Sequence, residues 1–217
     1  MYVPTHFSED RIEVLHDLIR KAGLATLVSM TTQGTANGAA NRLIASHAPL
    51  LLDPDPAPYG TLIGHLAKAN PHAQAADPGV QTLVIFQGSE GYITPSYYAA
   101  KQEHGKVVPT WNYAAIHAYG TLQMFDDPAR LLAVVTRLTR RHETPRAQPW
   151  AVSDAPADFV RGMLNGIVGI ALPIDRLEGK VKMSQNRPAT DIAGVVDGLR
   201  QDGRDDLATA VLRATAE

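Results

Sequence analysis

The chain has 217 residues, a length that fits one domain or one domain with an appendage. Apolar residues make up 45% and charged residues 19%, with a formal net charge of -2, so a general nucleic-acid binder is disfavoured because phosphate affinity needs clustered Lys and Arg. The absence of cysteine excludes disulfides and thiolate metal sites. With no apolar run long enough for a bilayer and no signal-peptide pattern at the start, we expect no membrane association and a cytoplasmic location.

The first half of the chain predicts one helix followed by strands. Ser8 is the expected N-cap of that helix, which has an apolar stripe at helical spacing and ends at Gly23. Strands are expected at 24–30, 39–52, 61–67 and 80–87, and the second of them is long. A turn at 32–38 and a Pro- and Asp-rich loop at 53–60 connect the first three. Residues 89–107 then read as an irregular, partly exposed excursion.

Residues 107–125, VVPTWNYAAIHAYGTLQMF, are expected to form the fifth strand. Because successive side chains of a strand point to opposite faces, one face carries Trp111, Tyr113, Ala115, His117 and Tyr119. The other face is small and carries Asn112, Ala114, Ile116, Ala118 and Gly120. The rings either line a planar pocket or fill the space between a sheet and a helix, and both interpretations stay open.

The second half of the chain alternates helices with late strands. The pattern predicts helices at 128–142, 157–165 and 205–215, and a further helix that begins at Pro188 and includes Leu199. Strands are expected at 168–173 and 177–183. The regular strand–helix alternation of a parallel sheet is missing. A mostly antiparallel barrel with covering helices, an α+β fold, therefore fits best.

Two polar segments stand out as possible phosphate sites. The first is GHLAKANP, in which His65 and Lys68 precede Asn70, although a straight strand points His65 and Lys68 to opposite sides. The second is KVKMSQNR, in which alternation places Lys182, Ser184 and Asn186 on one face. The alternative for the second segment is an exposed edge-strand end protected by lysines.

Several stretches, in this order and spacing, resemble the PaiB-like family of FMN-binding negative transcriptional regulators. They are MYVPTHF, SHAPLLLD, GTLIGHLAKANP, VIFQGSEGYITPSYY, VPTWNYAAIHAYG and KMSQNR. VPTWNY and KMSQNR are the most specific of them, and the resemblance runs from residue 1 to about residue 200.

The resemblance implies an antiparallel FMN-binding split β-barrel with peripheral helices, and a homodimer with FMN at the subunit interface. On that basis we expect a split-barrel domain at 1–183 and a C-terminal helical extension at 184–217. Lys182 and Ser184, with Lys68 and His65, are expected to bind the FMN phosphate, and Trp111, Tyr113 and His117 to lie near the ring system. Asn70, Gln185 and Asn186 complete the expected cofactor set.

Three functions fit this set of residues. The first is a flavin-binding regulator or sensor, and the second a flavin-dependent oxidoreductase acting on a small molecule. The third is a haem-binding or haem-degrading split barrel in which His117 or His65 ligates iron. The resemblance implies repression of transcription, but the sequence shows no helix-turn-helix pair with a basic recognition helix, so we expect weak or absent direct DNA binding.

Overall fold

The computed structural model describes residues 1–31, 42–77 and 79–216. The described chain is α+β, and its strand pairs are antiparallel. It divides into two compact units. The first unit comprises Met1–Leu18, Gln87–Ile116 and Glu178–Glu217, and the second comprises Ile19–Phe86 and His117–Leu177. The domain boundary expected at residue 183 stays a prediction.

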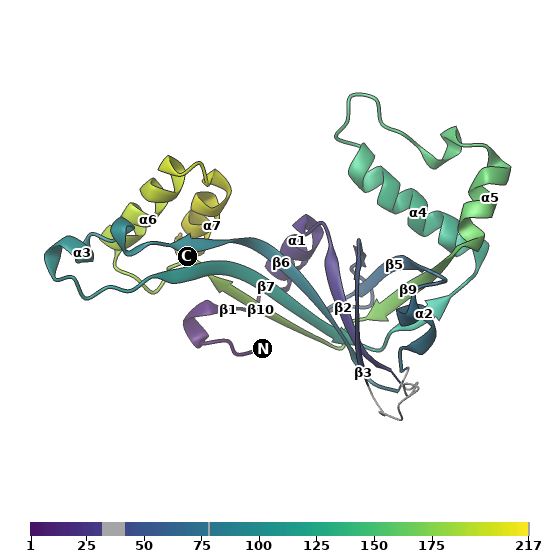
Figure 1. Ribbon diagram of the computed structural model, residues 1–217, viewed down its shortest axis with the longest axis horizontal. Coiled ribbons are helices and arrows are strands. Elements are labelled where there is room, and N and C mark those ends of the chain that lie inside the picture. The colour runs from purple at the N-terminus through teal and green to yellow at the C-terminus, as the bar shows by residue number, and fades with distance from the viewer. Residues whose placement is uncertain (32–41, 78, 217) are drawn as a thin grey trace. The chain divides into compact units, whose positions relative to one another are not determined.

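The described strands form two sheets (Figure 1). The six-stranded sheet has the order β1-β10-β7-β6-β2-β3, and the four-stranded sheet has the order β4-β5-β9-β8. In chain order the strands are β1 (Ser8–Glu9), β2 (Ala25–Thr31), β3 (Arg42–Ala48), β4 (Leu51–Asp53), β5 (Thr61–Ala67), β6 (Thr82–Ile93), β7 (Thr110–Gly120), β8 (Gln123–Phe125), β9 (Ile167–Pro173) and β10 (Arg176–Lys182).

The described helices are mostly short. The α-helices are α1 (Ile12–Lys21), α2 (Pro71–Ala75), α3 (Ala100–Glu103), α4 (Pro128–Glu143), α5 (Ala157–Asn165), α6 (Ala189–Gln201) and α7 (Asp205–Thr215). Single 3₁₀ turns are η1 (Thr5–Phe7), η2 (Pro95–Tyr97) and η3 (Val152–Asp154). Among the helices described, none has the length and apolar character needed to cross a membrane.

The first unit has an apolar core beneath its two C-terminal helices. In Figure 1, α6 and α7 lie together beside β6 and β7. Val195 and Leu199 of α6 and Leu207 of α7 pack with Ile93 of β6 and Ala114 of β7, and all are buried. This burial fixes the end of β6 and the start of β7, and the start of β7 carries the expected site residues Trp111 and Tyr113.

The second unit buries α4 against β4 and β5. Val134 and Leu138 of α4 pack with Leu51 and Ile63. The helix begins as predicted, with Pro128 as its first residue and the Asp127 carboxylate accepting a hydrogen bond from the backbone N–H of Arg130.

Two expected long strands are each divided between the two sheets. The strand expected at 39–52 is β3 in the six-stranded sheet and β4 in the four-stranded sheet, with the break at Pro49, which has no N–H to donate. The strand expected at 107–125 is likewise β7 and β8. A Cβ at Gly120, the last residue of β7, would lie 2.0 Å from the carbonyl oxygen of Pro173. The turn expected at 32–38 and residues 39–41 lie outside the described residues.

Two other expectations were wrong in detail. Ser8 does not cap α1, which begins at Ile12. Ser8 belongs to β1, where it pairs with Lys180 of β10. The irregular excursion expected from residue 89 begins later, because β6 continues to Ile93 before η2 and α3 follow.

Candidate functional site

The alternation of β7 follows the expectation. Asn112, Ala114, Ile116 and Ala118 are buried, whereas the residues between them are partly exposed. Trp111 at the start of the strand remains 47% exposed. The small face is therefore the packed one, and the face that carries the rings retains surface for contact with a ligand or partner.

The end of β10 brings a lysine to the start of β7. The Nζ atom of Lys182 donates to Thr110 Oγ1. Lys180, two residues earlier, is 8% exposed. Its Nζ lies 5.2 Å from the ring centroid of Tyr113 and donates to the backbone oxygen of Tyr2 at 3.1 Å. The first unit thus holds two ammonium groups, a hydroxyl and an aromatic ring close to one strand end.

A third cation adds to this positive charge. Burial is the largest cause that lowers the pKa of Lys182, and the charges of Lys180 and Arg187 lower it further. Arg187 lies with its guanidinium carbon 4.7 Å from the ring centroid of Tyr98. Among the described residues, none of the three cations forms an ion pair with a carboxylate. We call Lys180, Lys182 and Arg187 the cation cluster.

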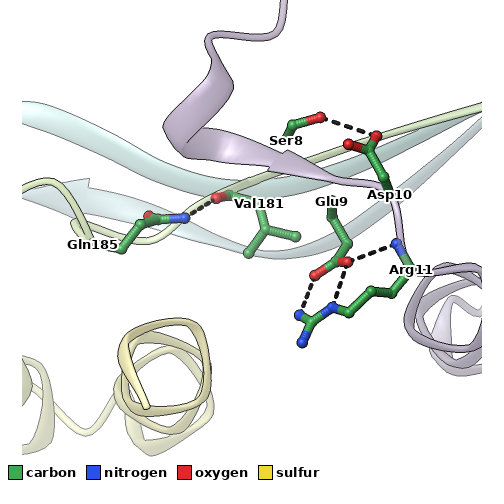
Figure 2. Close-up of polar contacts among 6 residues, drawn as sticks. All are labelled: Ser8, Glu9, Asp10, Arg11, Val181 and Gln185. Atoms are coloured by element: carbon green, nitrogen blue, oxygen red, sulfur yellow. Dashed lines mark hydrogen bonds and ion pairs between the residues drawn. The ribbon is translucent and has the colours of Figure 1, made fainter. Parts of the chain in front are cut away.

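The buried carboxylate of Glu9, on the neighbouring strand β1, forms an ion pair with Arg11 (Figure 2). Glu9 of β1 accepts from Arg11 Nε at 2.8 Å and from Arg11 Nη2 at 2.5 Å. It also accepts from the backbone N–H of Arg11 at 3.0 Å. Its pKa is lowered, chiefly by the side-chain hydrogen bond from Arg11. Because Glu9 pairs with Gly179, it lies on the opposite face of the sheet from Lys180 and Lys182.

The alternation expected through Lys182, Ser184 and Asn186 does not hold. Ser184 has a positive φ of 65°, so the extended chain turns there. Its buried hydroxyl accepts from Asn112 Nδ2 at 3.0 Å and donates to Asn112 Oδ1 at 3.1 Å. Asn112 belongs to the packed face of β7, so Ser184 fastens the chain end to the sheet, while Asn186 is exposed.

The amide of Gln185 also has partners within its own segment. Nε2 donates to the backbone oxygen of Val181 at 2.6 Å, as Figure 2 shows. Oε1 accepts from the backbone N–H of Met183 at 2.7 Å. These bonds hold the turn that follows Lys182.

The third-strand segment lies in the second unit. His65 is a residue of β5, half-buried, and its buried Nδ1 has no hydrogen-bond partner among the described residues. Burial lowers its pKa. Lys68 is exposed and follows the end of β5, so the strand does not decide which way it faces. Its backbone N–H donates to the oxygen of Gly166.

Asn70 is part of a buried polar network that the sequence did not indicate. It caps α2 by accepting from the backbone N–H of His72 at 2.9 Å, and its Nδ2 donates to Ser46 Oγ at 3.1 Å. The imidazole of His72, 0% exposed, lies between Ser46 Oγ at 3.1 Å from Nδ1 and Ser29 Oγ at 2.8 Å from Nε2. Ser29 also bonds to Thr82 Oγ1 at 2.6 Å. This network fastens α2 to β2, β3 and β6.

The ten expected cofactor residues fall into two groups. Trp111, Tyr113, Lys182, Ser184, Gln185 and Asn186 lie in the first unit, and His65, Lys68, Asn70 and His117 lie in the second. His117 is half-buried, with Nδ1 3.4 Å from the hydroxyl of Tyr119. Their joint role in binding one cofactor stays a prediction.

Sequence reasoning missed Lys180, Arg187 and Thr110. The signal for Lys180 was present, because the same alternation that selected Lys182 places Lys180 two residues away on the same face. Arg187 ends the KMSQNR segment. No local pattern marked Thr110, whose contact depends on strand pairing.

Solved structures share this fold at low sequence identity. The conserved hypothetical protein Rv2991 from Mycobacterium tuberculosis aligns with a TM-score of 0.55 and 13% identity, covering 87% of this chain and 94% of that one. The flavocytochrome Anf3 from Azotobacter vinelandii aligns with a TM-score of 0.54 and 13% identity, covering 83% and 72%. The fold is the antiparallel α+β fold of the FMN-binding split-barrel proteins.

Sequence comparison places the chain in a family. The family model described as "Putative FMN-binding domain" matches residues 1–176. Protease synthase and sporulation protein PAI 2 of Bacillus subtilis is 30% identical, over 93% of this chain and 90% of that protein. An uncharacterized protein of Emericella nidulans, AN0679, is 34% identical over 94% and 92%. The chain therefore belongs to this FMN-binding domain family and is homologous to PAI 2.

Proposed function

We propose that the protein binds FMN and that the cation cluster holds its phosphate. The observation that carries this proposal is the group of three cations in the first unit, which has no carboxylate partner among the described residues. Burial is the largest cause of the lowered pKa of Lys182, and the like charges of Lys180 and Arg187 add to it. A phosphate with nearly two negative charges relieves the repulsion among these like charges and accepts their hydrogen bonds.

The groups around the cluster also suit a flavin. Thr110 supplies a hydroxyl beside Lys182, and Tyr113 supplies a half-buried ring beside Lys180. We place the phosphate at Lys182 and Lys180, with Arg187 as an additional cation, and the ring system toward Tyr113. FMN would supply redox chemistry, and these side chains would bind and orient it. Ser184, Gln185 and Asn112 would position the segment that carries Lys182.

We propose a flavin-dependent sensor or regulator as the biological role, in line with the resemblance to the PaiB-like regulators. The formal net charge of -2 gives no support for direct DNA binding. Repression would then act through a partner or through the flavin state. A sequence-specific footprint of the isolated protein that survives physiological salt would overturn this part of the proposal.

A haem-binding function is the second candidate because the buried Nδ1 of His65 has no partner among the described residues. A free imidazole nitrogen can serve as an axial ligand to iron.

An oxidoreductase that uses the same flavin is distinguished from a sensor by a measurement of NAD(P)H oxidation.

The visible spectrum of the purified protein tests these alternatives. FMN gives an absorption band near ~450 nm, whereas haem gives a Soret band near ~400 nm. We expect the flavin band, either in the protein as purified or after addition of FMN and removal of the excess. A Soret band with no flavin uptake would favour haem and contradict the proposed function.

A further inference from the structure

The first unit contains a cavity of about 540 Å³ whose lining includes none of the three residues of the cation cluster. Its lining includes Glu90 and Tyr92 of β6, Tyr97 of η2, Trp111 of β7, and Asp202 and Arg204 from the α6–α7 connection. The volume falls within the range of small-molecule sites, which is about 300–1,000 Å³.

Two carboxylates of the lining each have one oxygen without a protein partner. The indole Nε1 of Trp111 donates to Glu90 Oε2, and the hydroxyl of Tyr97 donates to Asp202 Oδ2. Within the described chain, Glu90 Oε1 and Asp202 Oδ1 have no hydrogen bond or ion pair. Each carboxylate is thus held in place by an aromatic residue and keeps an acceptor available.

The arginine of the lining does not neutralise them. Arg204 Nη2 donates to the backbone oxygen of Glu90 at 2.7 Å, and Arg204 Nε donates to Asp206 Oδ1 at 3.3 Å. Its charge is therefore balanced by Asp206, whose pKa it lowers. The cavity keeps the negative charge of Glu90 and Asp202.

Two aromatic side chains of the lining, Trp111 and Tyr92, are exposed to solvent. Trp111 and Tyr92 have ring centroids 6.2 Å apart at an angle of 60°, and they are 47% and 52% exposed. The structural alternative is that these contacts only fasten the α6–α7 connection to β6. That task is met by the bonds of Arg204 and Asp202, and it does not require the two exposed rings.

We propose that this cavity binds a small organic cation of the alkylammonium class. The negative faces of aromatic rings attract a cation whose charge is spread over alkyl groups, and nearby carboxylates strengthen that attraction. The same charges disfavour an anion, so the site is distinct from the one proposed for the FMN phosphate. This inference does not depend on FMN binding.

Choline is the probe, and 3,3-dimethylbutan-1-ol is its neutral isostere. The chain has two tryptophans, so Trp150→Phe leaves Trp111 as the only indole reporter. We expect choline to cause a saturable change in Trp111 fluorescence, with calorimetry as the second measurement. The isostere should bind at least about tenfold more weakly, because it lacks the charge. Potassium chloride at equal ionic strength should cause no saturable change.

Substitutions distinguish choline binding in this cavity from a general effect of the protein's net charge. Glu90→Gln and Asp202→Asn should each weaken choline binding about tenfold. Asp158→Asn makes the same change in net charge at an exposed position of α5 and should leave binding unchanged. Tyr92→Leu removes a ring without removing a carboxylate and should also weaken binding. The proposal is overturned if choline shows no saturable binding, if the isostere binds equally well, or if Asp158→Asn weakens binding as much as Glu90→Gln.

Discussion

Lys182 is expected to contribute little to the stability of the fold and much to the affinity for FMN. Its one described hydrogen bond to a side chain is the bond to Thr110. We expect Lys182→Ala to lower the free energy of unfolding by at most about 1 kcal/mol. If Lys182 contacts the phosphate, the affinity for FMN should fall ten- to a hundredfold, or about 1.5–3 kcal/mol. Flavin-fluorescence titration measures the affinity, and urea unfolding measures the stability.

Lys106→Ala is the matched control for this variant. Lys106 is exposed and lies in the first unit, and its replacement removes the same charge. FMN affinity should remain within about twofold of the unsubstituted protein, because an exposed charge that does not contact the ligand is screened by salt. Equal dissociation constants for Lys182→Ala and Lys106→Ala would remove Lys182 from the site.

His72 makes stability depend on pH. Burial lowers its pKa below the ordinary value of 6.5, and burial lowers the pKa of His65 in the same direction. Below pH 6.5 the unfolded chain takes up protons that the folded chain refuses, so the free energy of unfolding should fall as the pH is lowered from 6.5. Above about pH 7.5 both states are neutral at these residues and the contribution is constant.

Unfolding of His72→Gln at several pH values checks this account. At pH 7.5 we expect a loss of about 1–3 kcal/mol, because the hydroxyls of Ser29 and Ser46 lose well-placed partners in a buried site. Below pH 6.5 the free energy of unfolding of this variant should decline less than that of the unsubstituted protein. Replacing the exposed His142 by Gln should leave the decline as it is, and a decline unaltered in His72→Gln would assign the effect to other groups.

Individual residues were predicted well where alternation continued and poorly where the backbone turned. The faces of β7 follow from alternation alone. Lys180 was missed, although the same alternation places it on the face of Lys182. Ser184 was misplaced because its left-handed φ ends the alternation, and serine does not mark such a position in the way glycine does. Asn70 caps α2, a role that asparagine before proline often has, and its expected role in cofactor binding stays a prediction.

At the scale of the element, two helical glycines are expected to respond in opposite ways to substitution. A Cβ at Gly194 of α6 would lie 2.0 Å from the backbone oxygen of Tyr97 in η2, whereas a Cβ at Gly162 of α5 would meet nothing within 4 Å. Gly194→Ala should therefore destabilise the protein by about 1–3 kcal/mol, since backbone must shift. Gly162→Ala should stabilise it by about 0.5–1 kcal/mol through helix propensity. Thermal or urea unfolding measures both, and stabilisation by Gly194→Ala would contradict the close contact of α6 with η2.

The existence of most elements could be predicted from the sequence, because their apolar periodicity is local. α5 and α7 match their predicted bounds, as does β5. The division of 39–52 and of 107–125 between two sheets could not be predicted in this way, since each half carries the same strand pattern. Which sheet a strand joins depends on partners distant in sequence, such as the pairing of β8 with β9.

At the scale of the whole molecule, we expect a twofold homodimer with the flavin site at the subunit interface. The resemblance to the PaiB-like family motivates this expectation, and twofold dimers are the commonest kind of homo-oligomer in general. Analytical ultracentrifugation at micromolar concentration should show a dimer. A monomer at that concentration would count against an interface site and would leave the cation cluster as a site within one chain.

The most direct test of the central claim compares FMN with riboflavin in a calorimetric titration of the same protein. The two ligands share the ring system and differ in the phosphate, which is the group assigned to the cation cluster. We predict saturable binding of FMN and binding of riboflavin that is weaker by tenfold or more, because charge-assisted hydrogen bonds to the phosphate are lost. Absence of FMN binding, or equal affinity for the two flavins, would contradict the account.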